Sequence, residues 1–220
     1  KEESGIRRVI ESYFRHLPKF DIELVDRETK RDDFDLLAVH AGAYDGPCDI
    51  CHCHGLYFSA DYTTAAWEWR TNSRVITNIR HAKEVTVPSS WVAETFQRDM
   101  RFTPHIIGHG IDWDAWQGVR DRRNHILWNK NRQSDVCDPE PVRVLAEAFP
   151  DKTFVSTFKL WGLPNVQDTG VIPFPEMREY VMTASVYLSS TKETFGIGTL
   201  EAMASGVPIL GFAHGGNLDL

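Results

Sequence analysis

The stretch "SSTKETFGIGTLEAMASGVPIL", residues 189–210, decides the fold class of this 220-residue chain. An apolar run leads into a loop that holds Glu193, Gly196 and Gly198. A helical pattern follows, with Glu201 expected in its first turn, and the apolar run "VPIL" closes the stretch. A buried strand, a glycine-bearing loop, a helix and another strand are typical of a parallel sheet covered by helices.

The same alternation extends through the rest of the chain. Helices are expected over residues 6–17, 61–82, 139–149, 176–184 and 198–204, with another that starts near Trp91. Strands are expected at "DIELV" (21–25), "CDICHCHG" (48–55), "EVTVPSS" (84–90), "HILWNKN" (125–131), "TFVSTF" (153–158) and "SVYLSS" (185–190). The charged, aperiodic text of residues 113–124 predicts a linker. The sequence therefore predicts an α/β fold with two Rossmann-like domains, residues 1–112 and 125–220.

Composition and charge restrict the class of protein. With 24 Lys and Arg against 31 Asp and Glu, the net charge of −7 disfavours a surface that coats nucleic acid. No run of about 18 apolar residues predicts a transmembrane helix, and no signal segment opens the sequence. Four cysteines, three of them within six positions, fit a reducing compartment. We therefore expect a cytoplasmic protein, with peripheral attachment to a membrane left open.

The stretch "CDICHCHG" allows three interpretations. Cys48-x-x-Cys51-His52 matches a haem-attachment motif, and thiols with imidazoles are also zinc ligands. On a strand, however, Cys51 and Cys53 point to one face, whereas His52 and His54 point to the other. The thiols and the imidazoles therefore cannot bind one metal ion from the same face of the strand. The alternation favours the third interpretation, a buried strand with cysteines at its apolar positions, and no metal site is expected.

The chemistry of residues 189–210 follows from their place at the end of a strand. Ligands of such sheets bind beyond the carboxyl ends of the strands, where free N–H groups at a helix start attract anions or sugar oxygens. Glu201 can accept two hydrogen bonds from a vicinal diol such as a ribose. Glu193 can reach the part of a ligand that lies over the loop. The alternative, a solvated helix start, remains open at this point.

Three blocks of the sequence together resemble the retaining glycosyltransferases of family 4, which have the GT-B fold. They are "KETFGIGTLEAMASGVPILGFAHGGN", "VTVPSSWVAETF" and "HIIGHGIDWDAW". The resemblance implies two Rossmann-like domains that face each other across a cleft. It also implies a preceding strand and further helices after the Gly-Gly, so the sequence reads as truncated at both ends.

The resemblance implies a sugar transfer from a UDP- or GDP-sugar to an acceptor hydroxyl, with retention of configuration and without a metal or other cofactor. The acceptor is then a sugar, a lipid-linked molecule or a protein. In this interpretation Glu193 and His54 are catalytic, and Glu201 holds the ribose. Lys130 or Arg132 neutralises the leaving diphosphate in place of the family's usual Gly-Arg and Lys, and the choice between the two remains open. The backbone that contacts the donor is that of Phe195, Gly196, Ile197, Gly198 and Thr199.

Several alternatives remain open on the sequence alone. The same fold also suits a sugar-nucleotide epimerase, or a domain that only binds a sugar nucleotide. His40 is interpreted as structural and His109 as a weak candidate for the cleft. The "DFD" of residues 33–35 is interpreted as a solvated turn, although other glycosyltransferases use Asp-x-Asp for a metal. The "GGN" of residues 215–217 is expected to open a further helix, and whether it lies by the donor, as the resemblance implies, remains open.

Overall fold

The computed structural model describes residues 5–25, 29–44, 46–55, 66–118, 121–130, 137–158 and 162–220. The chain divides into two compact units, Lys1–His109 and Gly110–Leu220. Each unit contains one parallel sheet with helices packed on it. The predicted α/β class with two Rossmann-like domains is therefore confirmed, and each unit is described by itself.

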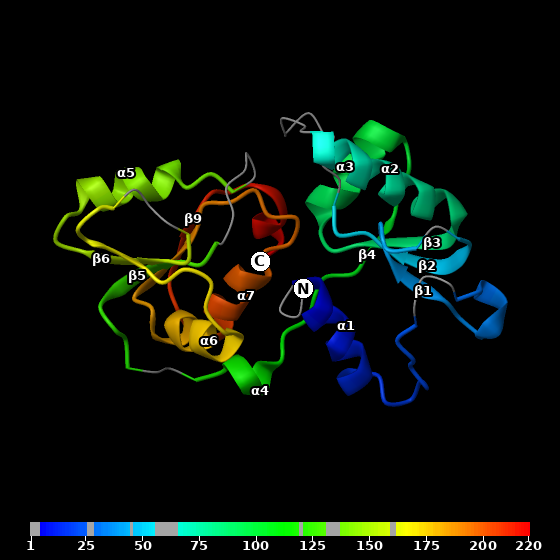
Figure 1. The fold of residues 1–220 in the computed structure, drawn as a ribbon, viewed down its shortest axis with the longest axis horizontal. Helices are drawn as coiled ribbons and strands as arrows, with labels where there is room; N and C mark the ends of the chain where they lie inside the picture. Colours follow the sequence, from blue (N-terminus) through cyan, green and yellow to red (C-terminus); the bar gives the residue numbers. More distant parts are fainter. Residues whose placement is uncertain are drawn as a thin grey trace. The chain divides into compact units, whose positions relative to one another are not determined.

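The first unit is built on a four-stranded parallel sheet. Its strands are β1 (Ala38–His40), β2 (Cys48–His52), β3 (Ala82–Val87) and β4 (His105–Ile106), in the order β1-β2-β3-β4. Its helices are α1 (Gly5–His16), the 3-10 turn η1 (Arg31–Asp33), α2 (Ala66–His81) and α3 (Ser90–Met100). Helices α2 and α3 connect neighbouring strands and cover one face of the sheet (Figure 1).

The two faces of β2 differ, as the alternation of its residues predicts. Cys51 and Cys53 are buried in the first unit's apolar core, together with Phe96 of α3. His52 lies on the opposite face, where its ring contacts Tyr13 of α1. The strand predicted at residues 21–25 is wrong, because this segment forms no strand and contributes only a partly buried Val25 to the core.

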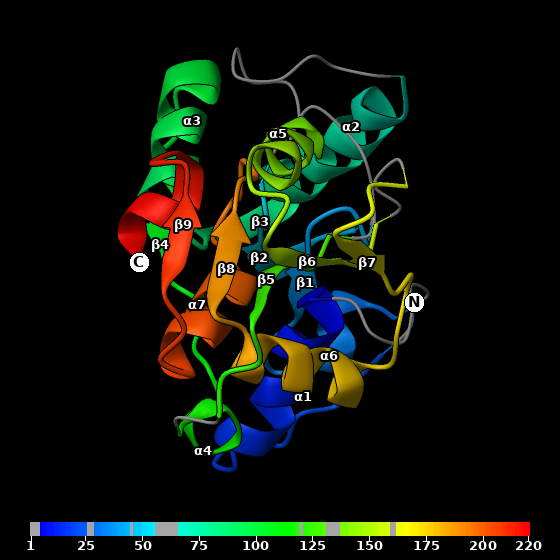
Figure 2. The same cartoon turned by 90° about the vertical axis from the view of Figure 1, so that its left-hand side faces the viewer.

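The second unit is built on a five-stranded parallel sheet. Its strands are β5 (His125–Trp128), β6 (Thr153–Ser156), β7 (Val166–Asp168), β8 (Val186–Ser189) and β9 (Ile209–Gly211), in the order β7-β6-β5-β8-β9. Its helices are α4 (Trp113–Trp116), α5 (Glu140–Ala148), α6 (Phe174–Thr183), α7 (Ile197–Ala204) and the 3-10 turn η2 (Gly215–Asp219). Helix α5 lies on one face of the sheet, and α6 and α7 lie on the other (Figures 1 and 2).

Residues 113–124, for which the sequence predicts a linker, lie inside the second unit. Asp112 caps the single-turn helix α4 by accepting a hydrogen bond from the N–H of Ala115 at 3.3 Å. Trp116 is buried in the core of this unit, and its carbonyl accepts a hydrogen bond from Ser205. The guanidinium of Arg122 donates to backbone carbonyls of α6 and of the turn after α7. Packing and capping thus order a segment that the sequence shows as aperiodic.

The strand order of the second sheet reverses between β5 and β8. From β5 the chain moves outward to β6 and β7, then returns through α6 to β8 on the other side of β5. In open parallel sheets, the crevice outside the carboxyl ends of two such strands is where ligands bind. The topology therefore predicts a ligand site at the residues that follow Trp128, the end of β5, and Ser189, the end of β8.

Candidate active site

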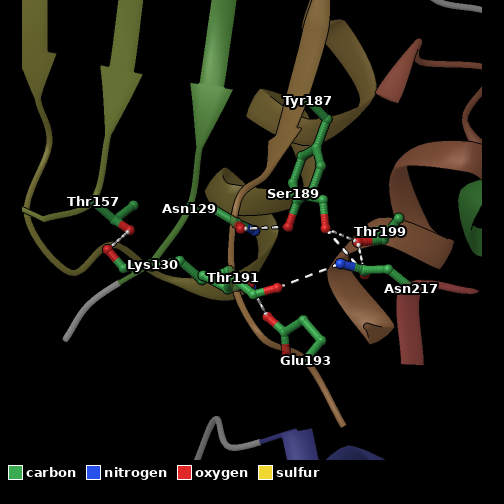
Figure 3. Close-up of polar contacts among 9 residues, drawn as sticks. All are labelled: Asn129, Lys130, Thr157, Tyr187, Ser189, Thr191, Glu193, Thr199 and Asn217. Carbon is green, nitrogen blue, oxygen red and sulfur yellow. Dashed lines mark hydrogen bonds and ion pairs between the residues drawn. The ribbon is translucent and has the colours of Figure 1, made fainter. Parts of the chain in front are cut away.

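A lysine and a glutamate meet at the reversal of strand order. Lys130 follows β5 and Glu193 follows β8, and Nζ of the lysine lies 2.5 Å from Oε1 of the glutamate (Figure 3 shows both loops). Thr191 donates its hydroxyl proton to the same Oε1 at 2.7 Å. The hydroxyl of Thr157 donates to the carbonyl of Lys130 at 2.8 Å, which fixes that residue's backbone. Lys130 and Glu193 thus form a charge-assisted hydrogen bond, and a threonine hydroxyl holds each of the two residues in place.

The lysine of this pair remains charged at neutral pH. Burial lowers the pKa of Lys130, but the negative charge of Glu193, the neighbouring Tyr187 and the hydrogen bond to Glu193 together outweigh it, so the pKa lies above its ordinary value. The side chains of Lys130 and Glu193 keep 20% and 27% of their surface exposed. A ligand at the strand ends can therefore reach a fixed positive charge and a carboxylate at the same place.

The start of α7 packs closely onto the strand beneath it. A Cβ at Gly198 would lie 2.4 Å from the hydroxyl oxygen of Tyr187, so only glycine permits this approach. The Tyr187 hydroxyl donates to Oδ1 of Asn129 at 2.8 Å, and burial raises the pKa of this phenol to about 12. Gly196, with φ of +96°, supplies the left-handed turn before the helix. These contacts fix the position of the start of α7 relative to strand β8.

The other candidate donor-binding residues lie next to Gly196 or in the first two turns of α7. Phe195 and Thr199 are buried, and the Thr199 hydroxyl lies 2.7 Å from that of Ser189. Glu201 is buried within α7 and lies in its second turn, because the helix begins at Ile197; the expectation of a first-turn position is wrong. Arg132 lies outside the described residues.

Four histidines gather in the first unit at the carboxyl edge of its sheet. Nδ1 of His40 lies 2.8 Å from Nε2 of His54, and the ring of His54 stacks on His109 with centroids 5.6 Å apart. Nδ1 of His52 lies 2.7 Å from the Thr86 hydroxyl. Burial, followed by repulsion from neighbouring imidazoles, lowers the pKa of His54 to about 3 and the pKa values of His40 and His109 to about 4. These imidazoles are neutral at pH 7.

In this histidine cluster (His40, His52, His54 and His109), residues that the sequence assigns to separate strands and turns lie in contact. His40 and His52 end neighbouring parallel strands, and Tyr13 of α1 stacks on His40 with centroids 6.2 Å apart. The available signal was the recurrence of a histidine near a glycine after each apolar run, in "AVHAG", "CHCHG" and "IIGHG". Parallel strands bring such residues to one edge.

Two further sequence signals have a structural explanation. Asp33 and Asp35 are exposed beside η1, where Asp33 accepts a hydrogen bond from the N–H of Lys30, in agreement with a solvated turn. Gly215 and Gly216 pack directly against the backbone of residues 193–195 and open the 3-10 turn η2. Within the ranges that the structure describes, no cluster of His, Cys, Asp or Glu is arranged to hold a metal ion.

Solved structures with a similar chain fold identify the fold. The chain resembles HepE of Anabaena, whose structure was determined with UDP and glucose, at a TM-score of 0.59 and 18% identity over 77% of this chain and 54% of HepE. It also resembles S. aureus TarM, in a complex with UDP, fondaparinux and α-GlcNAc-glycerol, at 0.52 and 12% over 80% of this chain and 43% of TarM. The chain therefore has the GT-B fold of glycosyltransferases, and it spans about half the length of HepE.

The sequence comparison gives the family. Residues 145–220 match the family described as Glycosyl transferases group 1. This range contains Glu193, Glu201 and the whole of α7. No curated protein is significantly similar in sequence to the chain. None of the helices in the described ranges has both the length and the apolar character needed to cross a bilayer.

Proposed function

We propose that this protein is a retaining glycosyltransferase that moves a sugar from a UDP- or GDP-sugar to an acceptor hydroxyl. The observation that carries the proposal is the Lys130–Glu193 pair, which lies at the reversal of strand order beside the start of α7. A departing nucleoside diphosphate needs fixed positive charge at a partly dehydrated site. The Lys130 ammonium and the N–H groups of the helix start supply it without a metal ion.

The roles of the other groups follow from this placement. The diphosphate competes with Glu193 for the ammonium of Lys130, which turns the carboxylate toward the sugar, where it stabilises the developing cation. The hydrogen bond from Thr191 keeps that carboxylate at the site when the lysine changes partner. The backbone of residues 195–199 contacts sugar hydroxyls and diphosphate oxygens, and Glu201 accepts hydrogen bonds from the ribose.

His54 is the proposed group of the first unit that acts in the transfer. Its imidazole is neutral at pH 7 and is hydrogen-bonded to His40, which fixes the ring. Because Nε2 of His54 contacts Nδ1 of His40, the other ring nitrogen, Nδ1, is the one that can donate to or accept from a sugar hydroxyl. The acceptor hydroxyl attacks from the face that the nucleotide leaves, so the anomeric configuration is retained and no covalent enzyme intermediate is needed.

Thermal unfolding with excess UDP, excess GDP or no nucleotide tests the donor site. A ligand at about 100 times its dissociation constant adds about 2.7 kcal/mol to the free energy of unfolding. For a chain of this length we expect a rise in Tm of about 5–10 °C with one of the two nucleotides. Glu201→Ala should abolish the shift, whereas the exposed Glu147→Ala should keep it. A wild-type protein that unfolds cooperatively at the same Tm in all three conditions would contradict the proposal.

A further inference from the structure

The loop that carries Glu193 rests on the two glycines of the "GGN" motif. The N–H of Gly216 donates to the carbonyl of Glu193 at 2.8 Å. A Cβ at Gly215 would lie 2.3 Å from that carbonyl oxygen, and one at Gly216 would lie 2.4 Å from the Cα of Phe195. The backbones are therefore in direct contact. The start of η2 forms the support beneath the loop.

The asparagine that follows the glycines connects three elements. Oδ1 of Asn217 lies 3.1 Å from the hydroxyl of Ser189, at the end of β8, and 3.3 Å from that of Thr199, in α7. Its Nδ2 donates to the carbonyl of Thr191 at 3.4 Å (Figure 3). A carbonyl only accepts hydrogen bonds, so this contact determines which end of the amide faces the loop.

The hydroxyl protons complete this network. Ser189 and Thr199 lie 2.7 Å apart, so one hydroxyl donates to the other, and the second donates to Asn217. Either arrangement uses both protons and keeps Oδ1 occupied. Both hydroxyl-bearing residues are buried. A buried network in which both hydroxyl protons are used holds the heavy atoms of its members in place.

Thr191 transmits this arrangement to the charged pair. Its backbone carbonyl is held by Asn217, while its hydroxyl donates to the same Glu193 oxygen that pairs with Lys130. We propose that Asn217 is a positioning residue: through Thr191 it fixes the Glu193 carboxylate, and it thereby governs recognition of the sugar and not of the nucleotide. This inference rests on the proposed function, because it assigns the Glu193 loop to the donor sugar.

The first experiment requires no ligand. Asn217→Asp keeps an acceptor for the two hydroxyls but replaces the donor that faces Thr191 with an oxygen, so it breaks that link selectively. We expect amide hydrogen exchange of residues 190–196 to rise about tenfold in N217D, with β5 and β6 unchanged. The matched control is N165D, because Nδ2 of Asn165 donates to the carbonyls of Ala146, Phe149 and Lys152, away from the loop. Unchanged exchange at 190–196, or a rise across the whole second unit, overturns the inference.

The second experiment separates sugar from nucleotide. Dissociation constants are measured for UDP and UDP-glucose, and for GDP and GDP-mannose. In N217D and in Thr191→Val, the gain in affinity that the sugar gives should fall about tenfold, or 1.4 kcal/mol, while nucleotide affinity changes by less than about threefold. Thr191→Ser keeps the hydroxyl and should keep the gain, and the double variant N217D/T191V should lose no more than either single one. Equal weakening of nucleotide and sugar nucleotide overturns the inference.

The two experiments also distinguish failure of the inference from failure of the proposed function. A wild-type protein that binds none of the four ligands overturns the proposed function, and the exchange of residues 190–196 still decides whether Asn217 positions the loop. A wild-type protein that shows the gain in affinity, with an unaltered gain in N217D, supports the proposed function and overturns the inference.

Discussion

The carboxyl edges of the two sheets hold their candidate functional side chains in opposite electrostatic states. In the first unit, burial and mutual repulsion keep the histidine cluster uncharged. In the second unit, burial acts on Lys130 in the same direction, but Glu193 lies 2.5 Å away and keeps the lysine charged. The comparison teaches that burial alone does not decide whether a side chain is ionised. The charge of the side chain that the neighbouring strand brings close to it decides the outcome.

Topology explains which neighbour each edge receives. The described strands of the first sheet follow one another in chain order, and three of them deliver a histidine at or just beyond their carboxyl ends. In the second sheet the order reverses, so β5 lies beside a strand that comes almost 60 residues later, as the register of Ile126 with Val186 shows. That reversal brings a cation and an anion together from distant parts of the sequence.

The largest expected effect is acid destabilisation of the first unit. The folded pKa values of the cluster lie below the unfolded value of about 6.5, so the unfolded chain binds more protons as pH falls from about 6.5 to 4. Stability is complete above about pH 6.5 and falls below it. We expect a loss of about 3 kcal/mol between pH 7 and pH 5, after allowance for partial exposure.

Peptide-resolved hydrogen exchange at both pH values measures this loss in each unit separately. His54→Gln should reduce the pH dependence of the first unit, and the exposed His81→Gln should leave it unchanged. The second unit should lose less stability, because Lys130 keeps its charge over this range and, among the described residues of this unit, burial lowers the pKa of one histidine, His125. An equal loss in both units would remove the contrast.

Removal of the cation from the second unit should have the next largest effect. Lys130→Met takes away the positive charge at the strand ends, and we expect about a 100-fold loss of affinity for the nucleotide that stabilises the wild type, or about 2.7 kcal/mol. Isothermal titration calorimetry measures it. Lys152→Met, at an exposed ion pair with Asp151, is the matched control and should bind normally. Affinity within about threefold of wild type for the Lys130 variant would show that the charge does not serve the ligand.

A smaller effect is expected where α7 meets β8. In Gly198→Ala the new methyl would lie 2.4 Å from the hydroxyl oxygen of Tyr187, so we expect a loss of about 2 kcal/mol in the free energy of unfolding. Urea denaturation measures it. In a Tyr187→Phe background the oxygen is absent, and the same glycine replacement should cost clearly less. Equal costs in both backgrounds would place the conflict elsewhere.

The smallest expected effect belongs to Tyr187→Phe alone. It removes the hydrogen bond to Asn129 but leaves the ring in the core, so we expect a loss of about 1 kcal/mol. The unfolding midpoint in urea should fall with an unchanged slope. A loss above about 3 kcal/mol would indicate that this bond does more than join β5 to β8.

Most of the α/β alternation could be predicted from the sequence, because apolar runs and helical spacing are local properties. The segment 189–210 folds as strand, loop, helix and strand. The failures lie where local signals are weak. Strand β7 has three residues, none of them buried, and α4 is a single turn stabilised by its cap and by the burial of Trp116. The apolar run at residues 21–25 contributes to the core without pairing with a strand.

The candidate site was only partly predictable for a related reason. Glu193 and Lys130 were identified separately, but their ion pair depends on the register of β5 with β8, which no local pattern encodes. Tyr187 and Asn129 were missed, because an aromatic residue in a strand or an amide in a loop has many ordinary explanations. Asn217 was noted only as the last residue of the "GGN" motif. The histidines were seen individually, but only the parallel register of β1 and β2 shows that two of them lie together.

The support that Gly215 and Gly216 give to the Glu193 loop has a consequence for synthesis of the protein. Ribosomes extend the chain at about 5–20 residues per second from the N-terminus. Strands β5 and β8 can pair before η2 has emerged from the ribosome. The loop between β8 and α7, however, lacks its backbone contacts with Gly215 and Gly216 until those glycines have been synthesised. Lys130 and Glu193 therefore acquire their final geometry only after η2 has been synthesised.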